Sequence, residues 1–188
     1  MIRVVKVGGS LLLNPMLVDT LQDWIGCQEP ATNVLIFGGG KVIDAIRELD
    51  TVHSLDPVAT HWHCIDLLDA MFQVVSDWFP AWEAIRSPEM LQDLSEQNSA
   101  AATRLVRVGA FYRPGDDSRL PQDWRTTTDS IAAHLAIRLN ADELVLLKSC
   151  DIPNEFTAAS LAATGIVDAA FPLIAQHVAR IRLERLQG

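Results

Sequence analysis

The sequence lacks the long apolar runs of a membrane protein. No apolar segment among its 188 residues approaches the roughly 18 residues that a membrane-spanning helix needs. The first residues, MIRVVKVGGSLLL, carry two glycines inside the apolar stretch, and no small-residue cleavage pattern follows, so they do not match a secretion signal. We therefore expect a cytoplasmic protein without a membrane partner.

Cysteine is scarce as well. The three cysteines, Cys27, Cys64 and Cys150, are odd in number and widely spaced, which fits reduced thiols better than a disulfide framework. Cys64 forms an HxHC cluster with His61 and His63, but residues i and i+2 of a helix face different directions, which disfavours a shared metal ion. We expect no metal site there, and instead core packing or a contact between His61 and the substrate.

Basic residues are fewer than acidic residues. The formal net charge of −9 opposes broad attraction to nucleic acid or anionic lipid, although a local basic cleft for phosphates stays compatible with it. The expected partners are a small anionic molecule and a second copy of the chain. With 49% hydrophobic residues, the chain is long enough for one buried core and too short for two ordinary domains, so we expect one domain over 1–188.

Lysine is rare among the basic residues. Of 15 lysines and arginines, only Lys6, Lys41 and Lys148 are lysines, and each lies beside a glycine-rich turn or at a strand end. A compact ammonium binds phosphate as a point charge, a role that the planar guanidinium does not reproduce. We therefore expect Lys6 and Lys148 to be functional, whereas for Lys41 function and chance stay equally open.

The first fifty residues repeat one design. Each unit consists of an apolar strand, a glycine turn and an amphipathic helix. In the first unit the strand covers 2–7, the turn is Gly8-Gly9-Ser10 and the helix covers 11–25. In the second unit the strand covers 33–37, the turn is Gly38-Gly39-Gly40 and the helix covers 41–49. Two such units predict an α/β fold, an αβα sandwich with a mainly parallel central sheet. The two glycine turns should then lie in adjacent loops over the carboxyl ends of the strands.

The other elements follow from periodicity and turn residues. The spacing predicts helices over 59–79, 88–96, 131–139 and 171–177, and strands over 104–112, 143–147 and, at an edge, 179–186. Thr126-Thr127-Thr128-Asp129 supplies N-cap side chains for the third of these helices. The helix over 59–79 has enough apolar breadth to form a dimer face, so we expect a homodimer.

The glycine turns carry the chemistry. A strand that leads into glycines at the start of a helix offers backbone N–H groups to an anion. Lys6 precedes Gly8 by two residues and lies on the strand, so VKVGGS is not the GxxxxGK[ST] phosphate loop. Alternation puts Val5 and Val7 on one strand face and Lys6 on the other. For this fragment alone, an ordinary tight turn remains the alternative. Two such turns could hold the transferred phosphate and the acceptor, as in-line phosphoryl transfer requires.

Three segments, in this order and spacing, resemble the amino acid kinase family, which includes the acetylglutamate, aspartate, uridylate and isopentenyl phosphate kinases. They are VVKVGGSLL, IFGGGKVIDAIR and TTTDSIAAHLAIRLNADELVLLKSCD, and the similarity covers most of the chain. Three further runs, THWHCIDLLDAM, LPQDW and GIVDAAFP, are similar to the small branch that contains the aminomethylfuran-methyl phosphate kinase of methanofuran biosynthesis.

The resemblance to the family implies a carbamate kinase-like fold and ATP-dependent phosphorylation of a phosphate or carboxylate. The resemblance to the small branch implies a role in one-carbon cofactor biosynthesis. Lys6 would contact the transferring phosphoryl group, and Asp129 would orient the catalytic lysines. The ATP phosphates, with Mg²⁺, would lie against Gly8, Gly9 and Ser10, with Lys148 and Asp151 in the nucleotide loop. The acceptor would lie against Gly38, Gly39 and Gly40, with Lys41 and His61 nearby.

One departure from the family pattern bears on catalysis. Larger members carry a second catalytic lysine in a glycine-rich helix start, whereas residues 164–170 here are TGIVDAA and no lysine follows Lys148. The nucleotide region is therefore reduced. Lys41, Lys148 or an arginine supplies the charge, or phosphoryl transfer is weak or absent. The alternative function is a protein of this fold that binds an anionic metabolite, or acts as a scaffold, without catalysis.

Overall fold

The computed structural model describes residues 1–96 and 101–187. Within them lies a six-stranded sheet in the order β3-β4-β2-β1-β5-β6, with every neighbouring pair parallel. The strands are β1 Ile2–Val7, β2 Thr32–Phe37, β3 Glu83–Ile85, β4 Ala102–Val106, β5 Glu143–Lys148 and β6 Ile181–Arg185. The expected αβα sandwich with a parallel sheet is confirmed.

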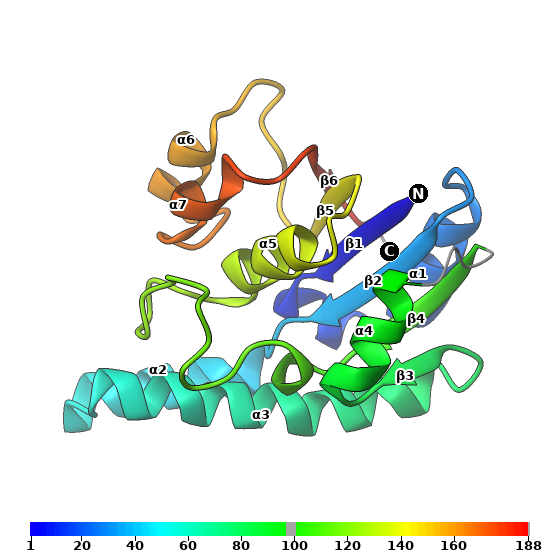
Figure 1. Cartoon of the computed structure of the whole chain (residues 1–188). Helices are drawn as coiled ribbons and strands as arrows, with labels where there is room; N and C mark the ends of the chain where they lie inside the picture. The colour runs from blue at the N-terminus through cyan, green and yellow to red at the C-terminus, as the bar shows by residue number, and fades with distance from the viewer. Residues whose placement is uncertain (97–100, 188) are drawn as a thin grey trace.

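Helices connect and cover these strands (Figure 1). Their bounds are η1 Gly9–Leu13, α1 Leu17–Gly26, α2 Lys41–His53, α3 Pro57–Trp78, α4 Pro88–Glu96, η2 Val108–Ala110, α5 Thr128–Arg138, α6 Ala158–Ala163 and α7 Phe171–Ala175, where η marks a 3-10 helix. The long helices α2 and α3 run side by side along one border of the molecule, while α5 lies directly against the sheet. Among the described residues, no helix is long and apolar enough to cross a membrane.

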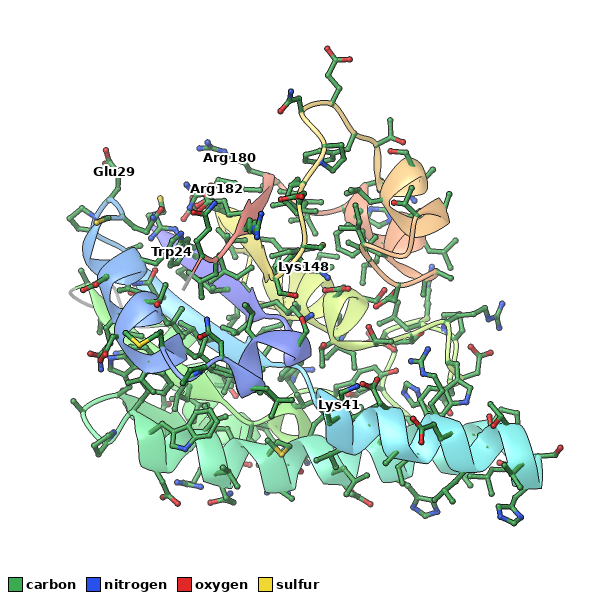
Figure 2. The ribbon with its side chains drawn as sticks, turned by 180° about the vertical axis from the view of Figure 1, so that it is seen from behind. Trp24, Glu29, Lys41, Lys148, Arg180 and Arg182 are labelled. Carbon is green, nitrogen blue, oxygen red and sulfur yellow. The ribbon has the colours of Figure 1, made fainter. Side chains whose placement is uncertain are left out.

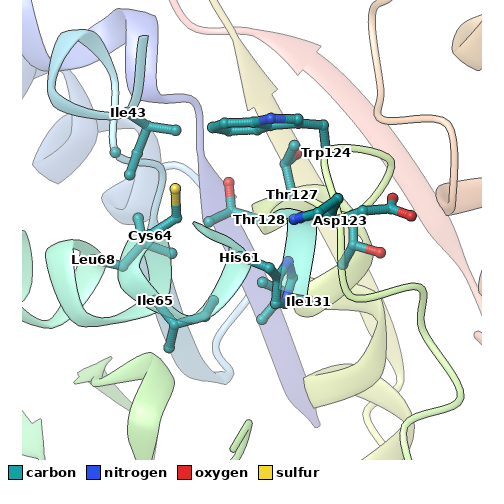
Figure 3. Close-up of a pocket in the computed structure, with 13 residues that line it drawn as sticks. Ile43, His61, Cys64, Ile65, Leu68, Asp123, Trp124, Thr127, Thr128 and Ile131 are labelled. Carbon is teal, nitrogen blue, oxygen red and sulfur yellow. The ribbon is translucent and has the colours of Figure 1, made fainter. Parts of the chain in front are cut away.

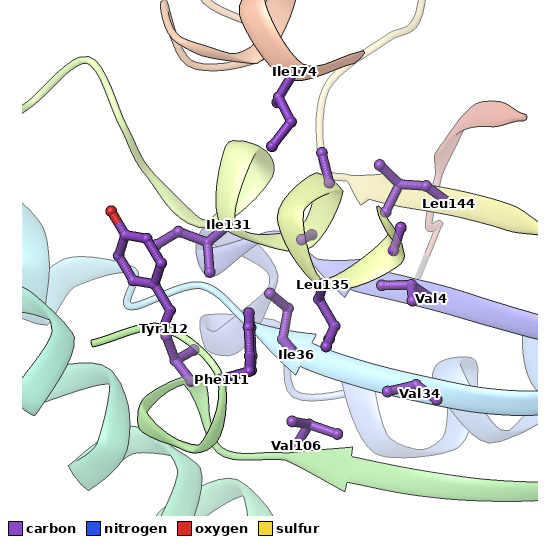
Figure 4. Close-up of a cluster of buried hydrophobic side chains, with 14 of the residues drawn as sticks. Val4, Val34, Ile36, Val106, Phe111, Tyr112, Ile131, Leu135, Leu144 and Ile174 are labelled. Carbon is purple, nitrogen blue, oxygen red and sulfur yellow. The ribbon is translucent and has the colours of Figure 1, made fainter. Parts of the chain in front are cut away.

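Both faces of the sheet are buried. Alternate strand residues enter two apolar clusters, as expected for a parallel sheet with helices on each side. One cluster joins Val4, Val34, Ile36 and Leu144 to α5 and to Phe111 and Tyr112 (Figure 4). The other joins Val5, Val7, Leu35 and Leu147 to α1 and the second half of α3. The cores thus hold β1 and β5 together and fix where their carboxyl ends point.

Three sequence expectations need correction. The helix expected over 11–25 is split, because Pro15 lacks a backbone N–H and Asn14 Oδ1 instead accepts from the Met16 amide at 3.0 Å. The strand expected over 104–112 ends at Val106, since the carboxylate of Asp69 accepts from the Gly109 amide at 3.1 Å and turns the chain. Strand β3 and helix α6 were not expected.

Candidate active site

Two glycine turns meet at the carboxyl ends of β1 and β2. The strands are parallel neighbours with Val7 opposite Phe37, and the Gly38 amide donates to the Val7 carbonyl at 2.9 Å. A Cβ added at Gly9 would lie 2.4 Å from the Gly40 nitrogen, so the turns touch backbone to backbone. Only glycine allows that approach, and Gly40 also has a φ of 54°. The expected adjacency of the two turns is confirmed.

A cleft of about 340 Å³ opens between these turns. Its walls come from the two glycine turns, from the start of α2 and from the start of α5; they include Lys6, Gly9, Ser10, Gly38, Gly39, Gly40, Lys41, Arg47, Thr127 and Thr128. The first N–H groups of a helix lack intrahelical partners and carry partial positive charge. The amino-terminal ends of two helices and a buried lysine therefore make this cleft suited to anions.

Beneath the cleft, two lysines share one carboxylate. Asp129 Oδ1 lies 3.0 Å from Lys6 Nζ, and Lys148 Nζ donates to both Asp129 oxygens at 2.8 Å. All three side chains are buried. Strand alternation turns Lys6 and Lys148 to the face that α5 covers, and Asp129 lies in the first turn of that helix. The cluster carries one excess positive charge when both lysines are protonated.

The cluster shifts the pKa values of its members. Burial alone would raise the pKa of Asp129, but the charges of Lys6 and Lys148 hold it below its ordinary value. Burial, together with the charge of Lys6, lowers the pKa of Lys148 to about 8, although Asp129 opposes this shift. The carboxylate thus stays ionised at neutral pH, while the Lys148 ammonium lies close to its titration range.

Asp168 caps the helix that carries Asp129. Its carboxylate accepts from the Thr127 amide at 2.9 Å, the Thr127 hydroxyl at 2.9 Å and the Ser130 amide at 3.0 Å, and also from the Ser130 hydroxyl. Burial and the charge of Asp129 raise the pKa of Asp168. The N-cap residue Thr127 makes no side-chain cap bond of its own, so the expectation that the Thr-Asp segment caps itself is wrong.

Of the remaining predicted phosphate and nucleotide residues, Ser10 lines the cleft, whereas Gly8 and Asp151 are not part of its walls. The Gly8 amide donates to the Leu147 carbonyl at 2.9 Å, which ties β1 to β5. Ser10 Oγ lies 2.7 Å from Ser149 Oγ, so the first turn contacts the loop after β5. Asp151, in that loop, is exposed and pairs with Arg185 at the end of β6.

Lys41 and Lys148 differ in environment. Lys41 stands at the start of α2 and Lys148 at the end of β5 (Figure 2). The Lys41 side chain is 77% exposed and lies 3.6 Å from Asp44, whereas Lys148 is buried against Asp129. Lys41 is therefore a rim residue of the cleft, and the buried positive charge comes from Lys6 and, below about pH 8, from Lys148.

A smaller pocket of about 60 Å³ adjoins the cleft (Figure 3). The two spaces share Gly39, Ile43, Thr127 and Thr128. The other walls of this side pocket are mostly apolar or aromatic: Pro57, His61, Cys64, Ile65, Leu68, Asp123, Trp124, Thr126 and Ile131. The pocket can accept a compact apolar group attached to an anion in the cleft.

Two polar groups mark the side pocket. Burial lowers the pKa of His61, and its Nε2 lies 3.0 Å from the Tyr112 hydroxyl, so a neutral ring is held in place. Thr126 is buried, and its hydroxyl has no hydrogen-bond partner among the described residues. Buried hydroxyls are rarely left without a partner, which marks this wall as a place for a ligand group. Sequence reasoning identified His61 and missed Thr126, Trp124 and Arg47.

The described residues contain no group of three or more His, Cys, Asp or Glu side chains placed to hold a metal ion. In particular, both oxygens of Asp129 are occupied by the lysines. Any Mg²⁺ at this site would be held chiefly by phosphate oxygens of a ligand.

Comparison with known proteins supports the fold. No family model matches the chain, and no curated protein matches it significantly in sequence. Among solved structures, uridylate kinase from Archaeoglobus fulgidus is 17% identical with a TM-score of 0.65, the match covering 100% of this chain and 91% of that one. UMP kinase from Ureaplasma parvum is 13% identical with a TM-score of 0.66, covering 100% and 89%. Aspartate kinase from Synechocystis is 16% identical with a TM-score of 0.63, covering 97% and 38%. The chain thus has the amino acid kinase fold.

Proposed function

We propose that this protein is a phosphotransferase that moves the γ-phosphoryl group of ATP to a phosphate or carboxylate of a small metabolite. The observation that carries the proposal is the Lys6–Asp129–Lys148 cluster, buried beneath a cleft between two glycine turns. A fixed excess positive charge at such a place stabilises the negative charge that spreads over the phosphoryl oxygens during transfer. The fold, shared with uridylate and aspartate kinases, agrees with this function.

In this proposal Asp129 has an orienting role. An acceptor oxygen displaces ADP from the γ-phosphorus, and because a phosphate or carboxylate oxygen is already anionic, no side chain has to remove a proton. Asp129 is unsuited to that task anyway, since its two oxygens accept from Lys6 and Lys148. It holds the two ammonium groups close together, and Lys6 lines the cleft directly.

The two glycine turns suit the two ligands of the proposed reaction, the ATP phosphates and the acceptor. Their backbones approach so closely that a Cβ at Gly9 or Gly40 would overlap the other turn, leaving a cleft wall without side chains. Gly9 and Ser10 would hold the ATP phosphates, and Gly38 to Gly40 the acceptor. ATP supplies the transferable group, and Mg²⁺ neutralises its oxygens when bound.

Lys148 replaces the second lysine of larger family members in this proposal. Asp168 occupies the segment where that lysine is expected, and it caps α5. Lys148 lies 2.8 Å from Asp129 and brings a second ammonium to the cluster from β5. Lys41 and Arg185 are less well placed, because the Lys41 side chain is 77% exposed and Arg185 pairs with Asp151.

The residues that line the side pocket indicate what kind of acceptor would fit the protein. The THWHCIDLLDAM and LPQDW runs, which carry the resemblance to the methanofuran branch, supply His61, Cys64, Ile65, Leu68, Asp123 and Trp124 to its walls. The residues that set this branch apart therefore line the space next to the acceptor turn. We include in the proposal an acceptor with a compact apolar body and a place in one-carbon cofactor biosynthesis.

Homodimer formation through α3 also belongs to the proposal. Its support is the exposure of Val58 and Val74 on this helix, 49% and 44%. The molar mass in solution tests it directly: twice the chain mass is expected, and a monomer at micromolar concentration contradicts it.

The decisive experiment is a screen of phosphorylated and carboxylated metabolites with ATP and Mg²⁺, with ADP and the phosphorylated product both measured. We expect saturable ATP binding and product from at least one acceptor, and a loss of product in Lys6→Met. Metabolite binding without ATP binding would instead support a noncatalytic binding protein. ATP hydrolysis that persists in Lys6→Met would reveal a contaminant.

A further inference from the structure

Arg47 is an exposed residue of α2 at the edge of the cleft. It lines the cleft, and its guanidinium carbon lies 4.6 Å from the centre of the Trp124 ring. Its charge also acts on Cys64 in the side pocket: burial raises the pKa of that thiol, and Arg47 partly offsets the shift. Arg47 therefore lines the cleft and contacts Trp124, which lines the side pocket.

Trp124 is fixed in place by the same helix. Its indole N–H donates to Asp50 Oδ2 at 2.6 Å, one turn after Arg47 on α2. Trp124 lies across the side pocket from His61 and Ile65 (Figure 3). The indole face thus forms a wall of the pocket and also a support for the guanidinium, since arginine stacks on aromatic rings.

The neighbouring carboxylates are engaged elsewhere. Asp44 lies 3.6 Å from Lys41, Asp50 accepts from Trp124, and Asp123 accepts from Arg125 at 2.7 Å. Among the side chains that the structure describes, no carboxylate lies within ion-pair distance of Arg47. An arginine that is held by an aromatic face keeps its N–H donors available for a ligand, and its planar fork matches the oxygens of a phosphate or carboxylate.

We infer that Arg47, positioned by Trp124, is the residue that selects an anionic acceptor. The guanidinium binds the phosphate or carboxylate that receives the phosphoryl group, while the body of the acceptor extends into the side pocket along the indole. The acceptor side is favoured over the ATP side because Arg47 follows the second glycine turn, whereas the loop after β5 contacts the first turn through Ser149 and Ser10. This inference rests on the proposed kinase function, which gives the first glycine turn to ATP and the second to the acceptor.

The test uses two probes, inorganic phosphate and phenyl phosphate, titrated by calorimetry against the full chain with a saturating nonhydrolysable ATP analogue. In Arg47→Met we expect the affinity for phenyl phosphate to fall roughly 10- to 100-fold, the usual range for losing charge-assisted hydrogen bonds. Arg47→Lys should recover part of that affinity. The affinity for the ATP analogue should stay within about threefold of wild type, since Arg47 binds the other ligand.

Arg86→Met is the matched control, because Arg86 stacks on Phe72 at 5.1 Å, away from the cleft. Three outcomes would overturn the inference. In the first, Arg86→Met lowers the affinity for phenyl phosphate as much as Arg47→Met does. In the others, Arg47→Met leaves that affinity unchanged, or the wild-type protein binds neither probe. Equal weakening of the ATP analogue and phenyl phosphate would also overturn it. Arg47-dependent binding in a protein without turnover would uphold the inference and reject the kinase function.

Discussion

Gly9 and Gly40 approach so closely that neither tolerates a methyl group. A Cβ on Gly9 would lie 2.4 Å from the Gly40 nitrogen, and one on Gly40 would lie 2.5 Å from the Gly9 carbonyl oxygen. These contacts involve backbone atoms, which cannot rotate away as a side chain can. The distance between the two turns, and hence the width of the anion cleft, depends on the missing side chains.

We therefore expect Gly9→Ala to force the turns apart. Overpacking of this kind typically costs about 1 to 3 kcal/mol of unfolding free energy. Phosphate affinity should fall with it, because the amides of both turns move. Denaturant unfolding and phosphate titration measure the two effects. Gly26→Ala is the control, since a Cβ there meets nothing within 4 Å, and it should be neutral or slightly stabilising. Wild-type stability in Gly9→Ala would contradict the close contact.

Anion binding should depend on pH through Lys148. Its pKa is lowered to about 8, so in the unliganded protein the ammonium is charged below pH 8 and neutral above it. A bound phosphate prefers the charged form, so the affinity for the phosphate dianion, corrected for the dianion fraction at each pH, should stay constant up to about pH 8. It should then fall by as much as tenfold per pH unit. Titration of Lys148→Met should give weaker binding without this fall. A wild-type affinity that rises above pH 8 would exclude Lys148 from the site.

Local sequence patterns predicted individual residues of the candidate site but only some of the contacts between them. Alternation correctly put Lys6 on the face opposite Val5 and Val7, because a strand has a period of two. The cluster with Asp129 and Lys148 also needs β5 beside β1, and that strand order is a tertiary property. The family resemblance, not the spacing of the residues, indicated that Asp129 belongs with the lysines.

Long-range contacts account for what the sequence did not predict. Asp168 lies 41 positions after Thr127, so no local capping motif indicates their hydrogen bonds. The one available signal was a carboxyl group inside the otherwise apolar run IVDAAF. Trp124 and Arg47 meet in the same way, across 77 residues of sequence, by a contact between α2 and the segment before α5.

The cap that Asp168 provides can be tested by removal. Asp168→Ala leaves the Thr127 and Ser130 amides at the start of α5 without their acceptor, so we expect a loss of about 2 kcal/mol in unfolding free energy. Because Asp129 lies in the same turn, phosphate affinity should fall as well. Asp56→Ala serves as the control: it removes the cap of α3, where Asp56 accepts from the Ala59 amide at 2.8 Å. It should cost stability without changing phosphate affinity. If both variants lose affinity equally, the effect of Asp168 is general destabilisation.

The sharpest prediction concerns Asp129→Asn. The sequence alone suggests that this change preserves a helix cap and leaves stability nearly unchanged. The structure leads to a different expectation, because the substitution removes the one carboxylate that pairs with both buried ammonium groups, Lys6 and Lys148, and leaves only the weaker action of Asp168 on Lys148. Removing one partner of a buried ion pair typically costs about 3 to 5 kcal/mol, and we expect a loss in that range at pH 7.

Two conditions should rescue the variant. Lys148, whose pKa is lowered to about 8 in the folded protein, binds fewer protons there than in the unfolded chain, so stability rises with pH until the unfolded-state value of about 10.4 is passed. The variant should therefore regain stability between pH 7 and 10, and saturating phosphate should stabilise it by restoring negative charge. Its rate of phosphoryl transfer should nevertheless fall on the order of 10² to 10³, because the lysines are no longer oriented. Thermal unfolding across pH, with Asp66→Asn as an exposed control, measures the first effects. A variant as stable as wild type at pH 7, with an unchanged rate, would show that Asp129 neither balances the lysines nor orders the site.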